Sequence, residues 1–280
     1  MVKISSVRRL LLSELYASSD NRFIVDCILK EITGLSQAEI LLGEAEISSQ
    51  QATKCRRIAS DYILGEPLQY LMGHWEFYGL DFEVGKGVLI PRADTETLCE
   101  KAILELPKGS VVADLCAGSG CIGITLSVYR PDITVYMIEK SKEAFKYLIK
   151  NTERHKNTSL FAIKGDVTDF KLINSLPKLD AILSNPPYLT KTDMTQIPKD
   201  VAKEPKEALY GGEDGLDFYR LIPSLWKNNL RDGGLIYMEI GATQSRDVYH
   251  IFEDEGYCVR DVFTDIEKRP RVVAAEKKGK

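Results

Sequence analysis

The chain has 280 residues, of which 44% are hydrophobic and 28% charged, and its formal net charge is −4. This composition is that of an ordinary globular protein with one large domain or two, and the acidic balance argues against a broad basic face for nucleic acid. The leucine run at the start soon meets Glu14, so it is too short and too charged for a secretory signal, and no stretch resembles a membrane span. We therefore expect a cytoplasmic protein. The six cysteines form no Cys-x-x-Cys pair, so neither a disulfide framework nor a zinc site is indicated.

Residues from about 5 to 65 are typical of a small bundle of short helices. Helix start and stop signals recur there: a capping box at Ser36-Gln37-Ala38-Glu39, glycine stops at Gly34 and Gly43, and a second start at Ser48-Ser49-Gln50-Gln51. Residues 1–90 carry 9 basic and 12 acidic side chains, a balance of −3 that makes a DNA-reading module a poor candidate. We predict a helical domain over residues 1–70; a structural cap and a protein-docking module both remain open.

A β-hairpin is predicted between this module and the rest of the chain. Residues 75–84 alternate aromatic or aliphatic with polar side chains around a glycine. We assign residues 71–90 to this hairpin linker. Asp94 or Thr95 is then placed to start a helix. Arg92 and Glu96, beside that start, could be functional, but a solvated first helical turn is the default interpretation.

From residue 110 onward, strand patterns alternate with helix patterns, which predicts a largely parallel sheet with helices on both faces. The expected strands are Val111 to Leu115, Thr134 to Ile138, Leu160 to Ile163, Ala181 to Ser184, Leu235 to Ile240, Val259 to Phe263 and Arg271 to Ala275. The expected helices are Ile122 to Tyr129, Glu143 to Thr152, Phe218 to Leu230 and Ser245 to Glu255. The sequence therefore predicts a seven-stranded, doubly wound α/β domain over residues 91–280.

Polar and small residues gather where these strands end. The first strand runs into a small-residue turn, Asp114 to Gly123, whose glycines let the backbone approach a ligand closely. Glu139 follows Gly118 by 21 residues, near the offset of about 20 expected for a ribose-binding carboxylate. Asp166-Val167 follows the third strand and could contact an adenine, or Asp166 could simply cap its loop. Because carboxyl ends of parallel strands share one edge, the combination favours a nucleoside site.

The fourth strand ends in Asn185-Pro186-Pro187-Tyr188. Prolines donate no backbone hydrogen bond, so the Asn185 side-chain oxygen and the Pro186 carbonyl form a region rich in acceptors and poor in donors. Such a region suits a bound NH2 group, and the Tyr188 ring could lie against a planar group. The alternative is that Pro-Pro only terminates a strand and Asn185 caps a turn.

Motifs that span nearly the whole chain recur together in one enzyme family. They are Arg57, Gly65-Glu66-Pro67-Leu68-Gln69-Tyr70, Leu89-Ile90-Pro91-Arg92-Ala93-Asp94-Thr95-Glu96, Asn185-Pro186-Pro187-Tyr188, Glu204-Pro205, Ala208-Leu209, Gly211-Gly212-Glu213-Asp214-Gly215-Leu216, Glu239-Ile240-Gly241 and Gln244. With these residues the chain resembles class I S-adenosylmethionine-dependent methyltransferases. More closely, it resembles the HemK/PrmC family, which methylates glutamine N5 in peptide chain release factors.

The resemblance implies a Rossmann-like methyltransferase sheet that binds S-adenosylmethionine. It implies that Asn185 and Pro186 are catalytic, since they would accept hydrogen bonds from the target amide NH2. Pro187 and Tyr188 would complete the substrate site beside them. The implied cofactor-binding residues are Asp114, Cys116, Ala117, Gly118, Ser119, Gly120, Glu139, Asp166, Val167 and Asn185.

The resemblance has departures and further implications. Cys116 replaces the first glycine usual in the turn, Val167 is smaller than many counterparts, and Lys203 stands where an aromatic residue is frequent. No metal ion is expected, because a sulfonium methyl group is already electrophilic. The implied partner is a class I release factor carrying a Gly-Gly-Gln loop. We expect a monomer without stable nucleic-acid binding or a membrane contact.

Other functions remain open from the sequence. An adenine-N6 methyltransferase on DNA or RNA could place an exocyclic amino group in the same corner after base flipping. The acidic amino-terminal module and the lack of an obvious target-recognition insertion argue against it. A glutamine of a ribosomal protein is a narrower competitor. A cofactor-binding interaction protein without catalysis is the third alternative.

Overall fold

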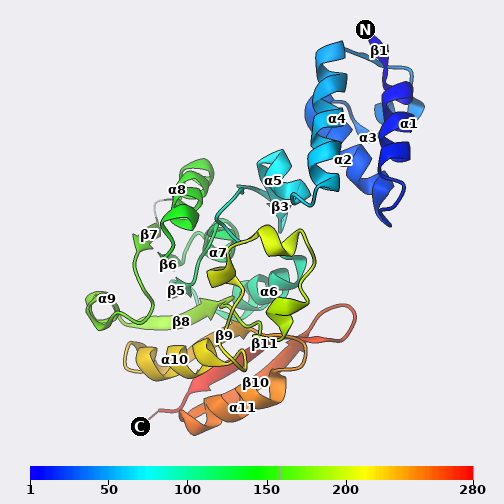
Figure 1. Ribbon diagram of the computed structural model, residues 1–280. Helices are drawn as coiled ribbons and strands as arrows, with labels where there is room; N and C mark the ends of the chain where they lie inside the picture. Colours follow the sequence, from blue (N-terminus) through cyan, green and yellow to red (C-terminus); the bar gives the residue numbers. More distant parts are fainter. Residues whose placement is uncertain (158, 280) are drawn as a thin grey trace. The chain divides into compact units, whose positions relative to one another are not determined.

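We describe a computed structural model of the chain over residues 1–157 and 159–279 (Figure 1). The chain divides into two compact units. The first comprises Met1–Gly73 with Lys199–Lys203, and the second comprises His74–Pro198 with Glu204–Lys280. None of the helices in the described residues is long and apolar enough to span a bilayer. The six cysteines are free thiols, and three of them are buried.

The first unit is a bundle of short helices. Its elements are β1 (Val2–Lys3), α1 (Ile4–Glu14), α2 (Asn21–Thr33), α3 (Gln37–Leu42), β2 (Glu46–Ile47), α4 (Ser49–Ile63) and α5 (Leu68–Met72). One apolar cluster joins them, with Ile4 and Leu11 of α1 packed among Val25 and Ile28 of α2 and Cys55 of α4. The helical character predicted from the start and stop signals is confirmed.

The predicted capping signals explain where these helices begin and end. Ser36 and Glu39 form a reciprocal capping box at α3, with the Ser36 N–H donating to Glu39 Oε2 at 2.8 Å. Ser48 and Gln51 form the same device at α4. Gly34 ends α2 in the left-handed conformation at a φ of 70°, where a side chain would be strained.

The second unit is built on a seven-stranded sheet. Its strands are β5 (Val111–Leu115), β6 (Thr134–Glu139), β7 (Leu160–Lys164), β8 (Leu179–Ser184), β9 (Leu230–Glu239), β10 (Tyr257–Thr264) and β11 (Pro270–Lys277). Its helices are α6 (Glu96–Glu105), α7 (Cys121–Tyr129), α8 (Lys142–His155), α9 (Phe170–Ser175), α10 (Asp217–Trp226) and α11 (Ser245–Asp254). It also contains the short 3-10 turns η1 (Ala93–Thr95), η2 (Asp193–Thr195) and η4 (Lys206–Ala208), while η3 (Val201–Lys203) belongs to the first unit.

The strand order is β10-β11-β9-β8-β5-β6-β7, and only β11 runs antiparallel to its two neighbours. The doubly wound, seven-stranded sheet predicted from the alternating pattern is therefore confirmed. The chain leaves β5 toward β6 and β7, then returns to the other side of β5 with β8. In open α/β sheets, ligands bind outside the carboxyl ends of the strands at such a switch point.

The two faces of the sheet carry separate apolar cores. Val112 of β5 packs with α6, α7 and Leu148 of α8 on one face. Its neighbour Ala113 packs on the opposite face with α10 and α11, including the fully buried Trp226. Successive strand residues point to opposite faces, so the continuous apolar strands are buried on both sides. Figure 1 shows α10 and α11 together on one side of the sheet.

The predicted hairpin is present as β3 (His74–Phe77) and β4 (Leu80–Glu83), within the second unit. Its turn places Tyr78 and Gly79 at φ values of 52° and 73°. The buried Asn151 of α8 holds it: Asn151 Oδ1 accepts the Glu83 N–H at 2.7 Å, and Nδ2 donates to the Glu83 carbonyl at 3.0 Å. The same Nδ2 donates to the Ser119 carbonyl at 2.9 Å, so the hairpin is connected to the small-residue turn after β5.

Two sequence interpretations are wrong. The helix expected over residues 218–230 ends at Trp226, because Leu230 instead begins β9, where it pairs with Leu179. The first turn near Arg92 and Glu96 is not simply solvated. Glu96 accepts the Tyr78 N–H at 2.8 Å, and Arg92 pairs with a carboxylate far along the chain.

Candidate active site

A cavity of about 560 Å³ lies at the carboxyl ends of β5, β6, β7 and β8. Its volume falls within the range of about 300–1,000 Å³ that is typical of small-molecule sites. The wall is mostly apolar with a few charged and polar groups. The lining includes Leu89, Ile90, Pro91, Arg92, Thr95, Cys116, Ala117, Gly118, Ser119, Ile138, Glu139, Lys140, Asp166, Val167, Thr168, Asn185, Pro187, Pro205, Glu207, Ala208, Phe218 and Leu221.

The small-residue turn after β5 forms one side of the cavity. Gly118 has a φ of 56°, and a Cβ atom placed there would meet nothing within 4 Å, so its backbone borders open space. Gly120 serves packing instead, since its Cβ would lie 2.5 Å from Leu148 Cδ1. Cys116 also adopts a left-handed φ of 60°. This conformation explains why glycine suits that position and shows that the cysteine adopts it at some conformational cost.

Glu139 presents a fixed carboxylate to the cavity. It is 8% exposed, and its two oxygens accept the backbone N–H groups of Gly118 at 2.8 Å and Ser141 at 2.6 Å. Burial raises the pKa of Glu139, which these hydrogen bonds oppose. Because each carboxylate oxygen has a second lone pair, the group can still accept hydroxyl donors from a ligand.

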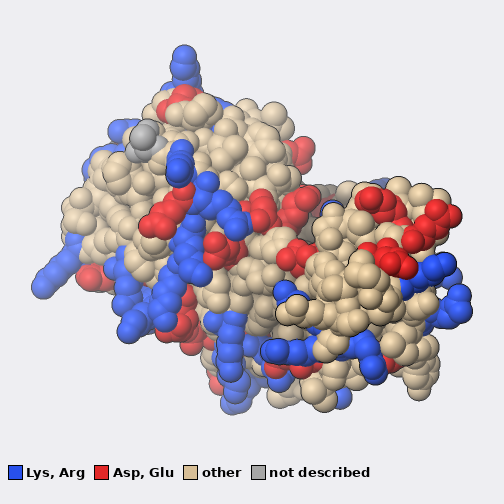
Figure 2. Space-filling model, turned by 90° about the horizontal axis from the view of Figure 1, so that it is seen from above, with Lys and Arg blue, Asp and Glu red and all other residues tan. Residues whose placement is uncertain are grey.

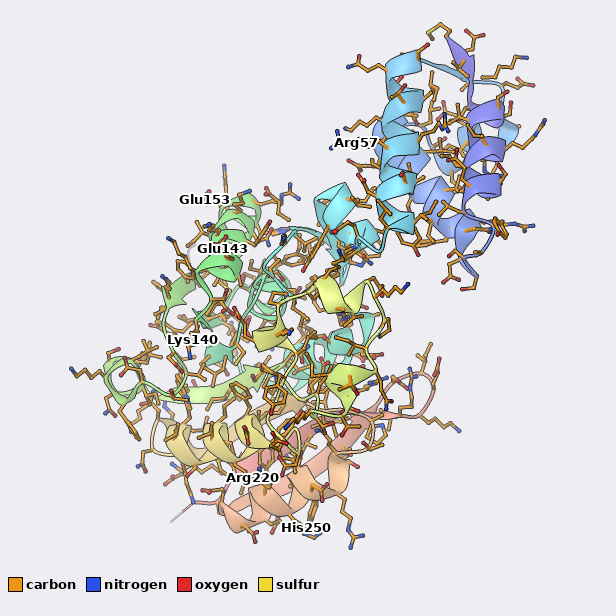
Figure 3. The ribbon with its side chains drawn as sticks, viewed as in Figure 1. Arg57, Lys140, Glu143, Glu153, Arg220 and His250 are labelled. Atoms are coloured by element: carbon orange, nitrogen blue, oxygen red, sulfur yellow. The ribbon has the colours of Figure 1, made fainter. Side chains whose placement is uncertain are left out.

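Asp166 and Val167 border the cavity after β7, but Asp166 is already engaged. Its Oδ1 accepts from the Thr168 N–H at 2.9 Å, and its Oδ2 lies 2.8 Å from Lys140 Nζ. Burial raises the pKa of Asp166, yet the hydrogen bonds from Lys140 and Thr168 outweigh it and leave the pKa below its usual value. Figure 3 shows Lys140 below α8, beside the sheet. The loop-capping role and the cavity position therefore coexist at Asp166.

Asn185 reaches the cavity from the end of β8. Its Nδ2 donates to Thr95 Oγ1 at 3.1 Å, so the nitrogen side of the amide faces Thr95. Pro187 also lines the cavity, whereas Pro186 and Tyr188 are outside the lining. Ser184, just before the corner, donates its hydroxyl to the Leu115 carbonyl at 2.7 Å. The ends of β5 and β8 are thus tied together.

Gln244 anchors the far side of the Asn-Pro-Pro-Tyr corner. Its Nε2 donates to the Tyr188 carbonyl at 3.0 Å and to the Gly215 carbonyl at 3.2 Å, while its Oε1 accepts the Gly241 N–H at 2.9 Å. A Cβ atom at Gly215 would collide with the Tyr188 carbonyl oxygen, so glycine is required there. Burial raises the pKa of the Tyr188 phenol, which keeps it neutral. Two separate segments, at Gly215 and at Gly241 to Gln244, therefore hold the corner in place.

A partly buried ion pair stabilises the rim of the cavity. The Glu204 side chain is 1% exposed and pairs with Arg92, whose side chain is 33% exposed. The other Glu204 oxygen accepts the Ile90 N–H at 2.9 Å. This pair connects the segment after the hairpin to the segment that carries Pro205 and Glu207, which lines the cavity.

Of the predicted site residues, the structure brings nine to the cavity wall: Cys116, Ala117, Gly118, Ser119, Glu139, Asp166, Val167, Asn185 and Pro187. Asp114 lies beneath them. It is buried, it accepts the Gly123 N–H at 3.0 Å, and burial raises its pKa to about 7. Its position indicates support for the turn after β5. Asp114 and Gly120, like Pro186 and Tyr188, lie outside the wall.

Sequence reasoning missed several wall residues, among them Thr95, Lys140, Glu207, Phe218 and Leu221. For Lys140 a signal was available, because it directly follows Glu139 at a strand end. Glu207 and Phe218 come from segments without a strand-end pattern. Only the folded chain brings them to the same cavity as Glu139.

Known proteins resemble this chain over most of its length. Residues 93–213 match the family model described as methyltransferase small domain. The release factor glutamine methyltransferase of Thermodesulfovibrio yellowstonii is 35% identical over 258 residues, which covers 89% of this chain and 90% of that protein. The protein of the same name from Aquifex aeolicus is 31% identical over 99% of both chains. Among solved structures, a methyltransferase from Pyrococcus furiosus aligns with a TM-score of 0.55 at 16% identity, over 79% of this chain and 98% of that one.

Proposed function

The chain belongs to the family of release factor glutamine methyltransferases, and we propose that its cavity serves methyl transfer from S-adenosylmethionine to a glutamine amide nitrogen of a class I release factor. The observation that carries the proposal is that Asn185 lines the same cavity as Glu139 and Gly118. An acceptor for an amide NH2 group and a fixed carboxylate for ribose hydroxyls therefore share one space.

The residues of the cavity fit S-adenosylmethionine. Glu139 keeps lone pairs for the two ribose hydroxyls while backbone N–H groups fix its position. Gly118 lets the backbone border the ligand without a side chain. Val167 offers an apolar surface for the adenine, and its carbonyl is fixed by the Trp226 indole N–H at 2.9 Å. When bound, S-adenosylmethionine supplies an electrophilic sulfonium methyl group.

The substrate amide is proposed to bind at the Asn185 corner. Because Asn185 Nδ2 is committed to Thr95, Oδ1 is the atom of this side chain that can accept a hydrogen bond from a substrate NH2. The Pro186 carbonyl is the proposed second acceptor, and Pro187 and Tyr188 are proposed to flank the amide plane. Two acceptors at fixed positions suit an NH2 group and disfavour a carboxylate or a carbonyl oxygen there.

These acceptors address the weakness of an amide as a nucleophile. The amide nitrogen shares its lone pair with the carbonyl, and positive charge develops on it in the transition state. Asn185 Oδ1 and the Pro186 carbonyl would stabilise that charge and align the nitrogen. Both groups are held by the rigid ends of β8 and its partners, so little reorganisation is required. We assign no general base, because proton loss follows the attack.

We also propose a separate role for each of three parts of the chain. Residues 1–70 would dock the release factor, residues 71–90 would form the connecting hairpin, and residues 91–280 would bind the cofactor and carry out the chemistry. The helical unit exposes large apolar side chains, including Phe23, Leu41 and Leu42, that suit a protein partner. Arg57 of α4, labelled in Figure 3, is also exposed there. We propose that the protein acts as a monomer in the cytoplasm.

An adenine of DNA or RNA is the competing candidate substrate for the same Asn-Pro-Pro-Tyr corner. It would require a basic surface that tracks phosphates. The net charge is −4, and acidic and basic side chains are interspersed on the face shown in Figure 2. These observations favour a protein amide over an adenine.

Labelled methyl transfer tests the proposal. The protein is incubated with S-adenosylmethionine labelled in its methyl group and with a release factor whose loop carries Gly-Gly-Gln or Gly-Gly-Glu. We expect label only in the glutamine form, because the glutamate form has no NH2 group. Duplex DNA, ribosomal RNA and ribosomal proteins are the parallel arms. Equal labelling of both loop forms, or labelling of nucleic acid alone, would contradict the proposed substrate.

A further inference from the structure

Behind Asn185, a chain of buried polar side chains leads away from the cavity. Asn185 Nδ2 donates to Thr95 Oγ1 at 3.1 Å, and the Thr95 side chain lies beside the carboxylate of Glu239, where it lowers the pKa of that carboxyl. Thr95 and Glu239 are each 1% exposed. Thr95 comes from η1 and Glu239 from the end of β9, so elements far apart in the sequence meet behind the catalytic amide.

The direction of this chain is determined at its inner end. The Thr95 oxygen already accepts from Asn185 and a carboxylate only accepts hydrogen bonds, so the open direction for the single Thr95 proton is toward Glu239. The Thr95 oxygen is then an acceptor on its other side, where the Asn185 NH2 group donates to it. That arrangement turns Asn185 Oδ1 away from Thr95 and toward the cavity.

We propose that Thr95 and Glu239 are positioning residues that fix the orientation of the Asn185 amide, so that its oxygen and not its nitrogen faces the substrate. This inference rests on the proposed function of Asn185. Without the chain, the amide could rotate by half a turn and present two N–H donors to a substrate NH2 group, which is a repulsive arrangement. The reaction would then be slowed without loss of the cavity.

The second carboxylate oxygen of Glu239 supports a role beyond structure. Glu239 Oε2 is buried and has no hydrogen-bond partner within residues 1–157 and 159–279. A purely structural buried carboxylate would be expected to satisfy both oxygens. Keeping a poorly satisfied charge next to Thr95 is understandable if that charge determines the direction of the hydrogen-bonded chain.

The ionisation of Glu239 gives the chain a measurable pH dependence. Burial raises the pKa of Glu239 to about 7, although the neighbouring Thr95 hydroxyl opposes this. Once protonated, Glu239 can donate to Thr95, which frees Thr95 to donate to Asn185 Oδ1 and permits the reversed amide. The charged groups that act on Glu239 are Asp94, which raises its pKa, and Arg271 and Arg92, which lower it; the neutral ionisable groups around it are Tyr188, Tyr219, Cys99 and Cys121.

Substitutions of Thr95 and Glu239 test the proposal in the full chain with S-adenosylmethionine and a Gly-Gly-Gln release factor. Thr95→Ser retains the hydroxyl, and we expect kcat within about threefold of wild type. Thr95→Val removes it, and we expect kcat to fall about 10- to 100-fold, with the Kd for S-adenosylmethionine within about threefold. Thr125→Val is the matched control, because Thr125 is fully buried in α7 and its hydroxyl has no partner among the described residues.

The pH profile separates positioning from structure. In wild type we expect kcat to rise with pH through an apparent pKa near 7 and to level off above it. Glu239→Gln should lower kcat and abolish this rise, because Gln can donate or accept toward Thr95 at every pH. Asp114→Asn should keep the rise, which shows that the other buried acid with a pKa of about 7 is not its source.

Each outcome is decisive. Thr95→Val and Glu239→Gln proteins that turn over at the wild-type rate with the wild-type pH profile overturn the positioning role, while the proposed function stands. A wild-type enzyme that transfers nothing to the glutamine form refutes the proposed function and this inference with it. If Thr95→Val fails to fold, the rates and pH profile of Glu239→Gln and Thr95→Ser decide the question.

Discussion

Replacing Glu239 by Gln removes a buried charge, so it should change the free energy of unfolding in a pH-dependent way. Glu239 is 1% exposed, and burial raises its pKa from an ordinary value of 4.5 to about 7. The folded state therefore holds a proton that the unfolded state has released between these two pH values. As pH rises through this window the wild-type protein loses stability, and the loss is complete above pH 7.

The size of the effect follows from the shift. A difference of one pKa unit corresponds to about 1.4 kcal/mol, so the wild-type cost is about 3 kcal/mol at pH 8 and about 1 kcal/mol at pH 5. Glu239→Gln carries no such charge, yet its Oε1 can still accept from Thr95. We expect the variant to be more stable than wild type by these amounts. Its kcat should at the same time be lower, as expected where a buried charge that costs stability serves activity.

Urea denaturation followed by tryptophan fluorescence measures this change in the relevant unit. Both tryptophans, Trp75 and Trp226, lie in the second compact unit, so the signal reports on the unit that contains Glu239. Glu153→Gln is the matched control, because Glu153 is an exposed residue of α8 (Figure 3) and should give almost no gain. A gain for Glu239→Gln that is the same at pH 5 and pH 8, or a loss at pH 8, would refute the reasoning.

Three further predictions concern the cavity. Asn185→Ala should lower kcat about 100- to 1,000-fold while the Kd for S-adenosylmethionine changes less than about fivefold, because it removes an acceptor that acts on the developing charge. The transfer assay measures kcat and calorimetry measures the Kd, and an unchanged kcat would contradict the proposed role of Asn185. Glu139→Ala should raise that Kd about 10- to 100-fold, since two charge-assisted hydrogen bonds to ribose are lost; isothermal titration decides it, and an unchanged Kd would remove Glu139 from the site. Arg92→Ala should destabilise the second unit by about 2–3 kcal/mol, because the buried Glu204 loses its cation. The loss should be smaller than for a fully buried pair, since a third of the Arg92 side chain is already exposed to solvent. A melting temperature within 1–2 °C of wild type, about the precision of the measurement, would contradict this prediction.

Much of the fold could be predicted from the sequence, because local pattern and tertiary packing agree in the sheet unit. The strand from Val111 to Leu115 was predicted with its exact bounds, and the other six strands differ only at their ends. The central strands β5 and β8 are mostly apolar runs buried on both faces, which is a strong signal. The end of α10 was wrong because Leu230 fits an apolar helical pattern equally well, and its pairing with Leu179 decides the outcome.

The site was predictable to the extent that its residues stand at strand ends. Glu139, Asp166 and Asn185 could be placed together because parallel strands end at one edge. Thr95 and Glu239 could not be joined to Asn185, because Thr95 and Glu239 are separated by 144 residues and come together only in the folded chain. The contact of Asp166 with Lys140 was missed, although Lys140 directly follows Glu139 at a neighbouring strand end.

The most direct test of the central claim is to locate the transferred methyl group. A Gly-Gly-Gln release factor is incubated with wild-type or Asn185→Ala protein and S-adenosylmethionine, and the loop peptide is then analysed by tandem mass spectrometry. We predict one methyl group on the side-chain nitrogen of the loop glutamine with wild type and almost none with Asn185→Ala. A methyl group on another residue of the release factor, or equal methylation by both proteins, would contradict the account.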